Sequence, residues 1–206
     1  MSARQAVPTP EEIAQLEPFE RLGLDRIVLA STAQQAERAA TQLQAAPAWG
    51  FDTESKPTFV KDQVSDGPHV LQLATAEQAF VFQLHDPECR AIAAALLART
   101  GVVKAGFGLG DDKKRIVSKL GIQPQDVLDL NNVFRARGWR KDMGVKAAVA
   151  VLFQRRFLKS KKAATSNWAN PRLSESQLVY AANDAWAAIR VFNALGLPSG
   201  TPSLPA

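Results

Sequence analysis

The chain has 206 residues, 46% of them hydrophobic and 22% charged, which suits one domain with a well-buried core. Its formal net charge of +5 favours a polyanionic partner without requiring one. The one cysteine, Cys89, excludes an internal disulfide and a cysteine-based zinc site, and two histidines are too few for a histidine-rich metal centre. No apolar run approaches the roughly 20 residues that span a bilayer, and the amino terminus lacks the order of a signal peptide. These features predict a cytoplasmic protein with no membrane partner.

Residues 1–25 are predicted to form a leader that packs on the domain. Thr9 can cap a helix that starts at Pro10, because threonine is favoured at the cap and proline at the first helical position. A strand is expected over residues 26–30. An Ala/Gln-rich helix that ends before Pro47 should follow it.

Three apolar stretches come next, over residues 49–54, 70–74 and 79–84. A loop containing Lys, Asp, Gly and Pro joins the first two, and the polar residues 75–78 form a hairpin-type connection between the last two. Because the links are short, these three strands should pair antiparallel.

Helices and strands alternate in the rest of the chain. The predicted elements are a helix over 86–97, a strand over 102–106, a helix from Asp111, a strand over 127–130, and helices over 145–158 and 174–195. Antiparallel strands followed by helix-connected strands predict an α/β fold in which a mixed sheet is flanked by helices. The domain is expected over residues 26–195, with a flexible C-terminal tail over residues 196–206.

The first acidic motif lies at the end of the strand over residues 49–54. Asp52 and Glu54 are separated by one residue, so on a strand their carboxylates lie on the same face. Two neighbouring carboxylates raise each other's pKa unless a cation lies between them, and a hard divalent metal ion is the usual cation. A strand that ends in an acidic turn would show the same pattern.

The second acidic motif follows the strand over residues 102–106. A glycine-rich turn leads into Asp111 and Asp112 at a helix start. Helix capping accounts for these acids as well as chemistry does. The glycine order G-x-G-x-G lacks the last gap of a dinucleotide-binding motif, so a nucleotide cofactor is not predicted.

The third motif lies on the last helix. Tyr180 and Asp184 are four residues apart and therefore share one helix face. Asp184 stands in an Ala-rich, apolar segment where a core residue would fit better, which favours a functional role.

Together, the three motifs resemble the DEDD superfamily of metal-dependent 3′–5′ exonucleases, in its tyrosine-containing branch. The family's Asp-x-Glu motif matches Asp52 and Glu54, and its last motif matches Tyr180 and Asp184. The middle motif matches the segment from Lys104 to Asp112; the spacing indicates Asp112, with Asp111 as the alternative. The Ser166-Asn167-Trp168 stretch is also similar to ribonuclease D and Werner-syndrome-type exonuclease domains.

This resemblance implies a ribonuclease H-like fold and a two-metal-ion mechanism with Mg²⁺ or Mn²⁺. By analogy, Asp52 would bridge the ions, Glu54 and Asp184 would bind the ion that carries the attacking water, and Asp112 would act mainly through water on the other. Tyr180 would orient the attacking water. The implied reaction removes nucleoside 5′-monophosphates from single-stranded or 3′-ended DNA or RNA.

Basic residues gather over residues 155–162, ahead of the helix that carries the third motif. A basic loop that carries an aromatic residue suits a phosphate backbone and a stacked base, although such a cluster is often only a solvated face. Phe59 could press on a terminal base or anchor its own loop. The residues predicted to bind nucleic acid are Lys161, Lys162, Asn167, Trp168 and Phe59.

The alternative hypothesis is a catalytically silent nucleic-acid-binding module on the same fold. Such a module is expected to lose one or more of the carboxylates, and all four are present. The oligomeric state is left open by the sequence.

Overall fold

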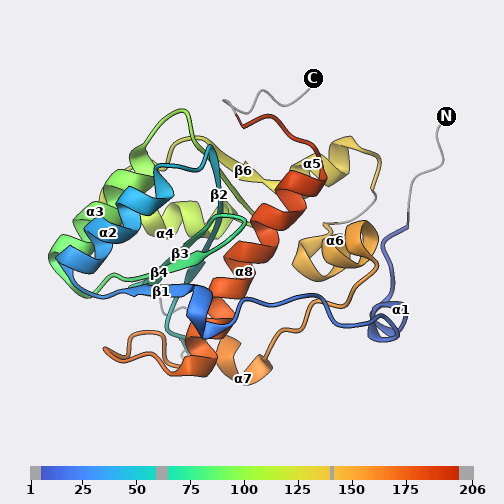
Figure 1. Cartoon of the computed structure of the whole chain (residues 1–206), viewed down its shortest axis with the longest axis horizontal. Helices are drawn as coiled ribbons and strands as arrows, with labels where there is room; N and C mark the ends of the chain where they lie inside the picture. The colour runs from blue at the N-terminus through green and yellow to red at the C-terminus, as the bar shows by residue number, and fades with distance from the viewer. Residues whose placement is uncertain (1–5, 59–64, 140–141, 200–206) are drawn as a thin grey trace.

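The protein is described by a computed structural model that covers residues 6–58, 65–139 and 142–199 (Figure 1). In these ranges the strands form one six-stranded mixed sheet in the order β1-β4-β3-β2-β5-β6. The strands are β1 (Ile27–Ala30), β2 (Ala48–Glu54), β3 (Val70–Ala74), β4 (Ala79–Gln83), β5 (Val103–Gly106) and β6 (Val127–Asp129).

Helices cover both faces of this sheet. Helices α2, α3 and α4 pack on one face, and α8 crosses the other, with α6 beside it (Figure 1). The helices are α1 (Pro10–Ala14), the 3-10 turn η1 (Leu24–Arg26), α2 (Ala33–Leu43), α3 (Pro87–Ala98), α4 (Gly110–Leu120), α5 (Leu130–Ala136), α6 (Gly144–Phe153), α7 (Lys161–Ala164) and α8 (Glu175–Ala194).

The predicted fold class is confirmed. Strand β3 pairs antiparallel with both β2 and β4, as the short links indicated, and the helix-connected strands β5 and β6 continue the sheet in parallel. Strand β1 adds a parallel partner for β4 at the opposite edge, which the local pattern did not predict.

One predicted boundary is wrong, and two short helices were missed. The helix predicted over residues 145–158 ends at Phe153, because Gln154 adopts a left-handed conformation with φ of 52°. Helix α5 begins directly after β6, with Asp129 as its cap. Helix α7 lies inside the basic segment and is capped by Ser160. Both helices are short, so neither shows a helical period in the sequence.

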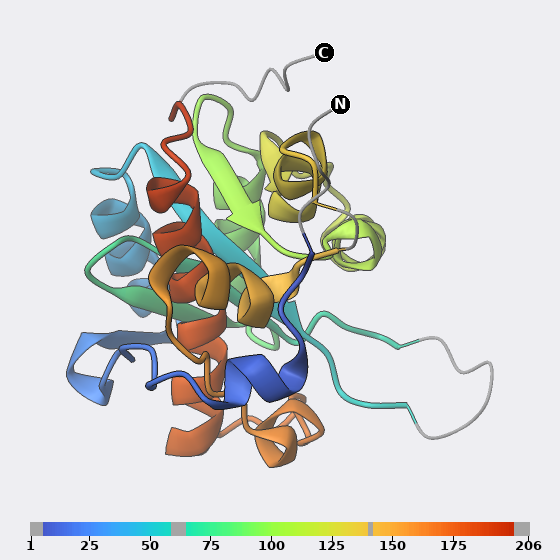
Figure 2. The ribbon, with the colours of Figure 1, turned by 90° about the vertical axis from the view of Figure 1, so that its right-hand side faces the viewer.

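The described part of the leader, residues 6–25, lies along α6 and α8 (Figure 2). Thr9 and Glu12 form the capping box of α1. Phe19 is buried and donates its N–H to the carbonyl of Arg156 at 2.9 Å. The amide of Asn183 accepts from Leu22 N at 2.8 Å and donates to Leu22 O at 3.2 Å. The leader is therefore bonded to α8 one residue before Asp184.

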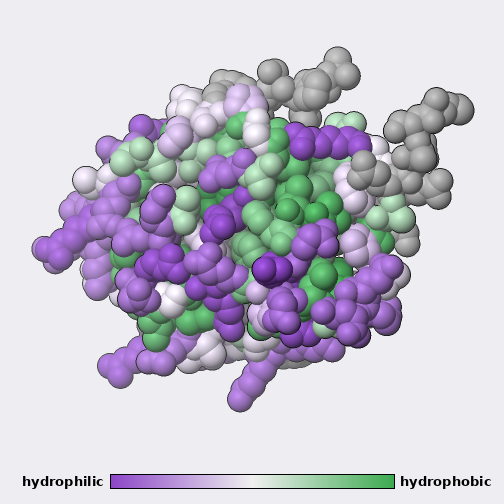
Figure 3. Space-filling model, turned by 45° about the vertical axis from the view of Figure 1, so that its right-hand side comes forward, coloured by the Kyte–Doolittle hydropathy of each residue, from purple (hydrophilic) through white to green (hydrophobic). Residues whose placement is uncertain are grey.

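No helix in the described ranges combines the length and the apolar composition needed to cross a bilayer. One face of the molecule carries mostly hydrophilic side chains, with hydrophobic areas between them (Figure 3).

Helix α8 lies unusually close to the backbone of β2. A Cβ atom at Gly50 would overlap the carbonyl oxygen of Ala185 and lie 3.0 Å from the backbone nitrogen of Ile189. Glycine is needed here because both neighbours are backbone atoms, which cannot move aside singly. The close approach brings the middle of α8 down onto the strand that carries Asp52.

We expect Gly50→Ala to destabilise the protein by at least about 2 kcal/mol, since the added methyl group must push α8 off the sheet. Gly110→Ala is the matched control, because a Cβ at Gly110 would have no heavy atom within 4 Å. Urea denaturation of both variants measures the difference. Equal stability of the two would contradict the close packing of α8 on β2.

Candidate metal centre

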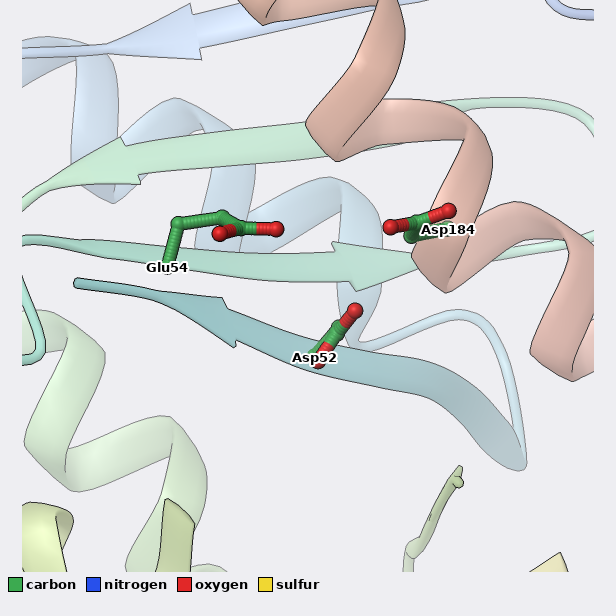
Figure 4. A group of neighbouring side chains, drawn as sticks. All are labelled: Asp52, Glu54 and Asp184. Carbon is green, nitrogen blue, oxygen red and sulfur yellow. The ribbon is translucent and has the colours of Figure 1, made fainter. Parts of the chain in front are cut away.

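Three carboxylates converge where α8 crosses the end of β2. Asp52 and Glu54 project from one face of β2, and Asp184 comes from α8 above that face (Figure 4). One carboxylate oxygen of each residue lies within 4.8 Å of one of each of the others. Phe51, the residue before Asp52, points to the other face of β2 and packs in the core on the α2 side. The alternation of β2 therefore sets the direction of both acids.

Asp112 lies near this group, in the first turn of α4, but is not one of the three residues whose carboxylate oxygens lie within 4.8 Å of one another. Its Oδ1 accepts a hydrogen bond from Oγ1 of Thr53, the residue between the two acids of β2. Asp111 instead is exposed and forms an ion pair with Lys114 at 3.3 Å. Of the two acids that the spacing left open, Asp112 is the one that is bonded to β2 and whose charge acts on Asp52 and Glu54.

Burial and crowding disfavour charge on these carboxylates. The pKa of Asp52 is raised to about 8, first by burial and then by the charge of Asp184. The pKa of Glu54 is raised to about 9 by burial and then by Asp52. Burial also raises the pKa of Asp184 and of Asp112. A group of this kind needs cations to hold its charges together.

The residues fit a hard divalent metal ion. The donors are all carboxylate oxygens, the ligands that Mg²⁺ and Mn²⁺ prefer. Both oxygens of Asp184 are buried, and no described residue donates to them with hydrogen-bond geometry. Oδ2 has the ammonium group of Lys159 at ion-pair distance, whereas Oδ1 has no donor among the described residues. A buried carboxylate oxygen without a donor is costly, and a bound metal ion removes that cost.

Lys159 is a site residue that the sequence analysis did not select. Its Nζ lies 2.7 Å from Oδ2 of Asp184, at ion-pair distance, and 5.3 Å from the centre of the Tyr180 ring. Burial lowers the pKa of Lys159, but the charges of Asp184 and Asp52 outweigh burial and raise it above its ordinary value. The sequence showed only its membership of a basic segment, which many solvated lysines share.

Tyr180 lies one helical turn before Asp184 on α8, with its ring 5.8 Å from the ring of Trp168. Burial and then the charge of Asp184 raise the pKa of its hydroxyl. Tyr180 is therefore a protonated phenol at neutral pH, suited to hydrogen bonding rather than to acting as a strong base.

The predicted nucleic-acid-binding residues differ in their exposure to solvent. Lys161 and Lys162 are exposed at the start of α7. Asn167 is exposed, and its side chain bonds within its own loop to Asn170 and Ala169. Trp168 is only 1% exposed and belongs to the core beneath Tyr180, so it has no free face on which a base could stack; this prediction is corrected. Phe59 lies outside the described residues.

Two cavities border Asp184. One, of about 350 Å³, lies between Asp52, Lys159 and the start of α6, and is also lined by Asn131. The other, of about 300 Å³, lies between Tyr180 and the leader, and is lined by Leu24. Each is large enough to take part of a nucleotide next to the carboxylates.

Comparison with known proteins agrees with this geometry. The sequence model of a 3′–5′ exonuclease family matches residues 27–197. A 3′–5′ exonuclease of Arabidopsis thaliana is 26% identical over 193 residues, which are 86% of this chain and 66% of the plant protein. The bifunctional 3′–5′ exonuclease/ATP-dependent helicase WRN of Mus musculus is 26% identical over 153 residues, 71% of this chain but 11% of the mouse protein.

Among solved structures, the fold is similar to RNase D of Trypanosoma brucei, with a TM-score of 0.74 at 21% identity over 85% of this chain and 66% of that one. The family match covers most of the chain, and the chain belongs to the 3′–5′ exonuclease family. It spans slightly less than two thirds of the plant relative and a small part of the mouse protein.

The raised carboxylate pKa values predict a pH-dependent stability without metal. Above the ordinary pKa values of 3.8 and 4.5, the folded state keeps protons on Asp52 and Glu54 that the unfolded chain has released. The free energy of unfolding should therefore fall as pH rises towards about 8 and 9. In EDTA, the melting temperature should be lower at pH 8 than at pH 6, and Mn²⁺ should remove this difference.

The control for this experiment is the double variant Asp52→Asn/Glu54→Gln, which cannot release these protons. Its melting temperature in EDTA should change less between the two pH values than that of the wild type. A wild-type melting temperature that rises over this interval would contradict the assigned direction.

Thr53→Val should weaken metal binding, because Asp112 loses the hydroxyl that holds its carboxylate against β2. We expect the Mn²⁺ affinity, measured by isothermal titration calorimetry, to fall by roughly 10-fold. This is the lower end of the range for loss of a hydrogen-bond partner of a metal ligand. Thr53→Ser keeps the hydroxyl and should retain most of the affinity. Equal affinities of the two variants would show that this hydrogen bond does not position Asp112.

Proposed function

We propose that this protein is a metal-dependent 3′–5′ exonuclease that removes nucleoside 5′-monophosphates from the 3′ end of nucleic acid. The observation that carries the proposal is the convergence of Asp52, Glu54 and Asp184, with Asp112 beside them, in a chain of the 3′–5′ exonuclease family. A phosphodiester bond in water is very inert. Four carboxylates and a phenol cannot hydrolyse it alone, so the site needs bound metal ions.

The carboxylates are proposed to hold two Mg²⁺ or Mn²⁺ ions. Such a pair, when bound, supplies an activated nucleophile and stabilises the leaving oxygen. The charges of Asp184 and Asp112 both raise the pKa of Asp52, so Asp52 is the residue that would share bound ions with both. Tyr180 is protonated and one turn from Asp184, so its hydroxyl can orient the attacking water. Lys159 adds a positive charge beside the same carboxylate.

The proposed substrate is single-stranded or 3′-ended nucleic acid. The Trypanosoma brucei RNase D has been solved in complex with RNA, which supports a nucleic-acid partner for this fold. The exposed Lys161 and Lys162 lie in the helix that follows Lys159 and are suited to backbone phosphates. The silent binding module is disfavoured, because a module without catalysis has no need to hold three carboxylates within 4.8 Å of one another, one of them buried.

The test uses 5′-labelled DNA and RNA oligonucleotides with Mg²⁺, Mn²⁺ or EDTA. The wild type should produce a metal-dependent ladder that shortens from the 3′ end. Asp184→Asn should abolish it, with at least a 10³-fold loss of rate, since a carboxylate that binds metal becomes a neutral amide. Tyr180→Phe should slow hydrolysis by about 10-fold to 100-fold and leave Mn²⁺ affinity unchanged.

Arg38→Gln serves as a control variant of changed charge, because Arg38 is exposed on α2, on the face of the sheet away from α8, and forms no ion pair within the described residues. It should leave the ladder intact. A wild type that is inactive on single strands, duplexes and recessed ends with either metal would reject the exonuclease and leave the binding module.

A further inference from the structure

A further cavity, with a mostly polar lining, is lined by none of the four carboxylates of the metal centre. Its volume is about 280 Å³. Four elements meet around it: the segment before β3, the connection from β4 to α3, the end of α4 and the loop before α8. Its polar lining residues are His69, His85, Arg90, Lys119, Asn170 and Asp66.

The charge of this cavity is positive. Arg90 and Lys119 carry permanent charges, and neither has a carboxylate within ion-pair distance among the described residues. Arg90 is held in place by a hydrogen bond from its Nη1 to the carbonyl of Leu84 at 3.3 Å, which leaves most of its guanidinium donors for another acceptor. Asp66 is the acid of the lining, and its Oδ1 pairs with Nε2 of His69 at 3.2 Å.

The lining chemistry favours an anion over a metal ion. Within the described ranges, the acidic and histidine side chains that come close enough to share a metal ion are Asp52, Glu54 and Asp184, so the histidines of this cavity form no such group. Two cations in the lining would also repel a metal ion. Arginine and lysine with neighbouring N–H donors are instead the usual partners of phosphate.

The cavity is connected to the metal centre through two of its walls. His69 donates its backbone N–H to the carbonyl of Glu54 at 2.9 Å, directly at the end of β2. Trp168 lines the cavity and packs against Tyr180. The carbonyl of Asn170 is fixed by Nε2 of Gln83 at 3.1 Å. Both walls therefore contact elements that carry side chains of the proposed active site, β2 through Glu54 and α8 through Tyr180.

We propose that this cavity, which we call the Arg90–Lys119 pocket, binds a phosphate group of the substrate strand upstream of the 3′ end. The inference rests on the proposed exonuclease function and adds a site that holds the strand outside the metal centre. The phosphate lies against Arg90 and Lys119, and the amide and imidazole groups of the lining surround it. Such a contact contributes to the affinity for long strands but not for a dinucleotide at the metal centre.

The test measures binding in an Asp52→Asn background, so that it does not depend on catalysis. Arg90→Gln/Lys119→Gln should weaken binding of a 12-nucleotide single strand by about 10-fold at low salt, measured by fluorescence anisotropy. The slope of log affinity against log salt should become shallower by about 0.7 for each phosphate contact that is lost. Affinity for a dinucleotide, measured by competition, should change less than about twofold.

The matched control is Arg38→Gln/Arg99→Gln, which removes the same charge at exposed positions away from the pocket. It should bind both strands like the background protein. Asp66→Asn should act in the opposite direction and tighten binding of the long strand, because it removes the acid of the lining. Affinity of the pocket variant equal to that of the control, or weaker binding by Asp66→Asn, would overturn the proposal.

Inorganic phosphate distinguishes the source of the anion. At constant ionic strength, phosphate should displace the long strand from the background protein more strongly than from the pocket variant. Equal displacement from the background protein and the pocket variant would reject a strand phosphate in the pocket, and binding of phosphate to the background protein without displacement of the strand would assign the pocket to free phosphate. Degradation by the wild type is measured separately from strand binding. If the pocket variants bind the strand normally, the exonuclease proposal still stands, and if the wild type is inactive, the binding result still stands.

Discussion

The burial of several carboxylates under one helix is the constraint on which the rest of the structure depends. Asp52 and Glu54 would repel each other and Asp184 at the distances observed, and burial weakens the screening that water would provide. The fold keeps these groups together by strong packing of apolar residues around them. A bound cation would turn the same repulsion into attraction, so the site would gain stability from the metal ions that it is proposed to hold.

Helix α8 supplies that packing and carries two of the functional side chains. Its inner face is rich in alanine, which allows the close approach to Gly50 of β2. Trp186 fixes the same helix to the β3–β4 connection through a hydrogen bond to the carbonyl of Ala76 at 2.8 Å. Asn183 fixes it to the leader. The position of Asp184 is therefore set by contacts on both of its sides.

The segment between α6 and α8 links the metal centre to the surface. The left-handed turn at Gln154 ends α6 and directs the chain towards Asp184, where Lys159 forms its ion pair. The chain then passes through α7, buries Trp168 beneath Tyr180 and reaches Asn170 at the Arg90–Lys119 pocket. One continuous stretch thus contacts Asp184, packs against Tyr180 and forms a wall of the Arg90–Lys119 pocket.

The sequence by itself determined the longer helices and strands, the mixed character of the sheet and the acidic motifs, but not the helices α5 and α7 or the pairing of β1 with β4. Alternation along β2 and helical spacing on α8 are local properties, which is why the acidic motifs could be recognised. The spacing also indicated Asp112, and its bond to Thr53 is what separates it from the exposed Asp111. Only the tertiary structure decided the rest. The burial of Trp168, the ion pair of Lys159 and the meeting of Arg90 with Lys119 arise between segments far apart in the chain. The local hydrophobic pattern of the sequence cannot predict such contacts, because they depend on how closely the helices pack on the sheet.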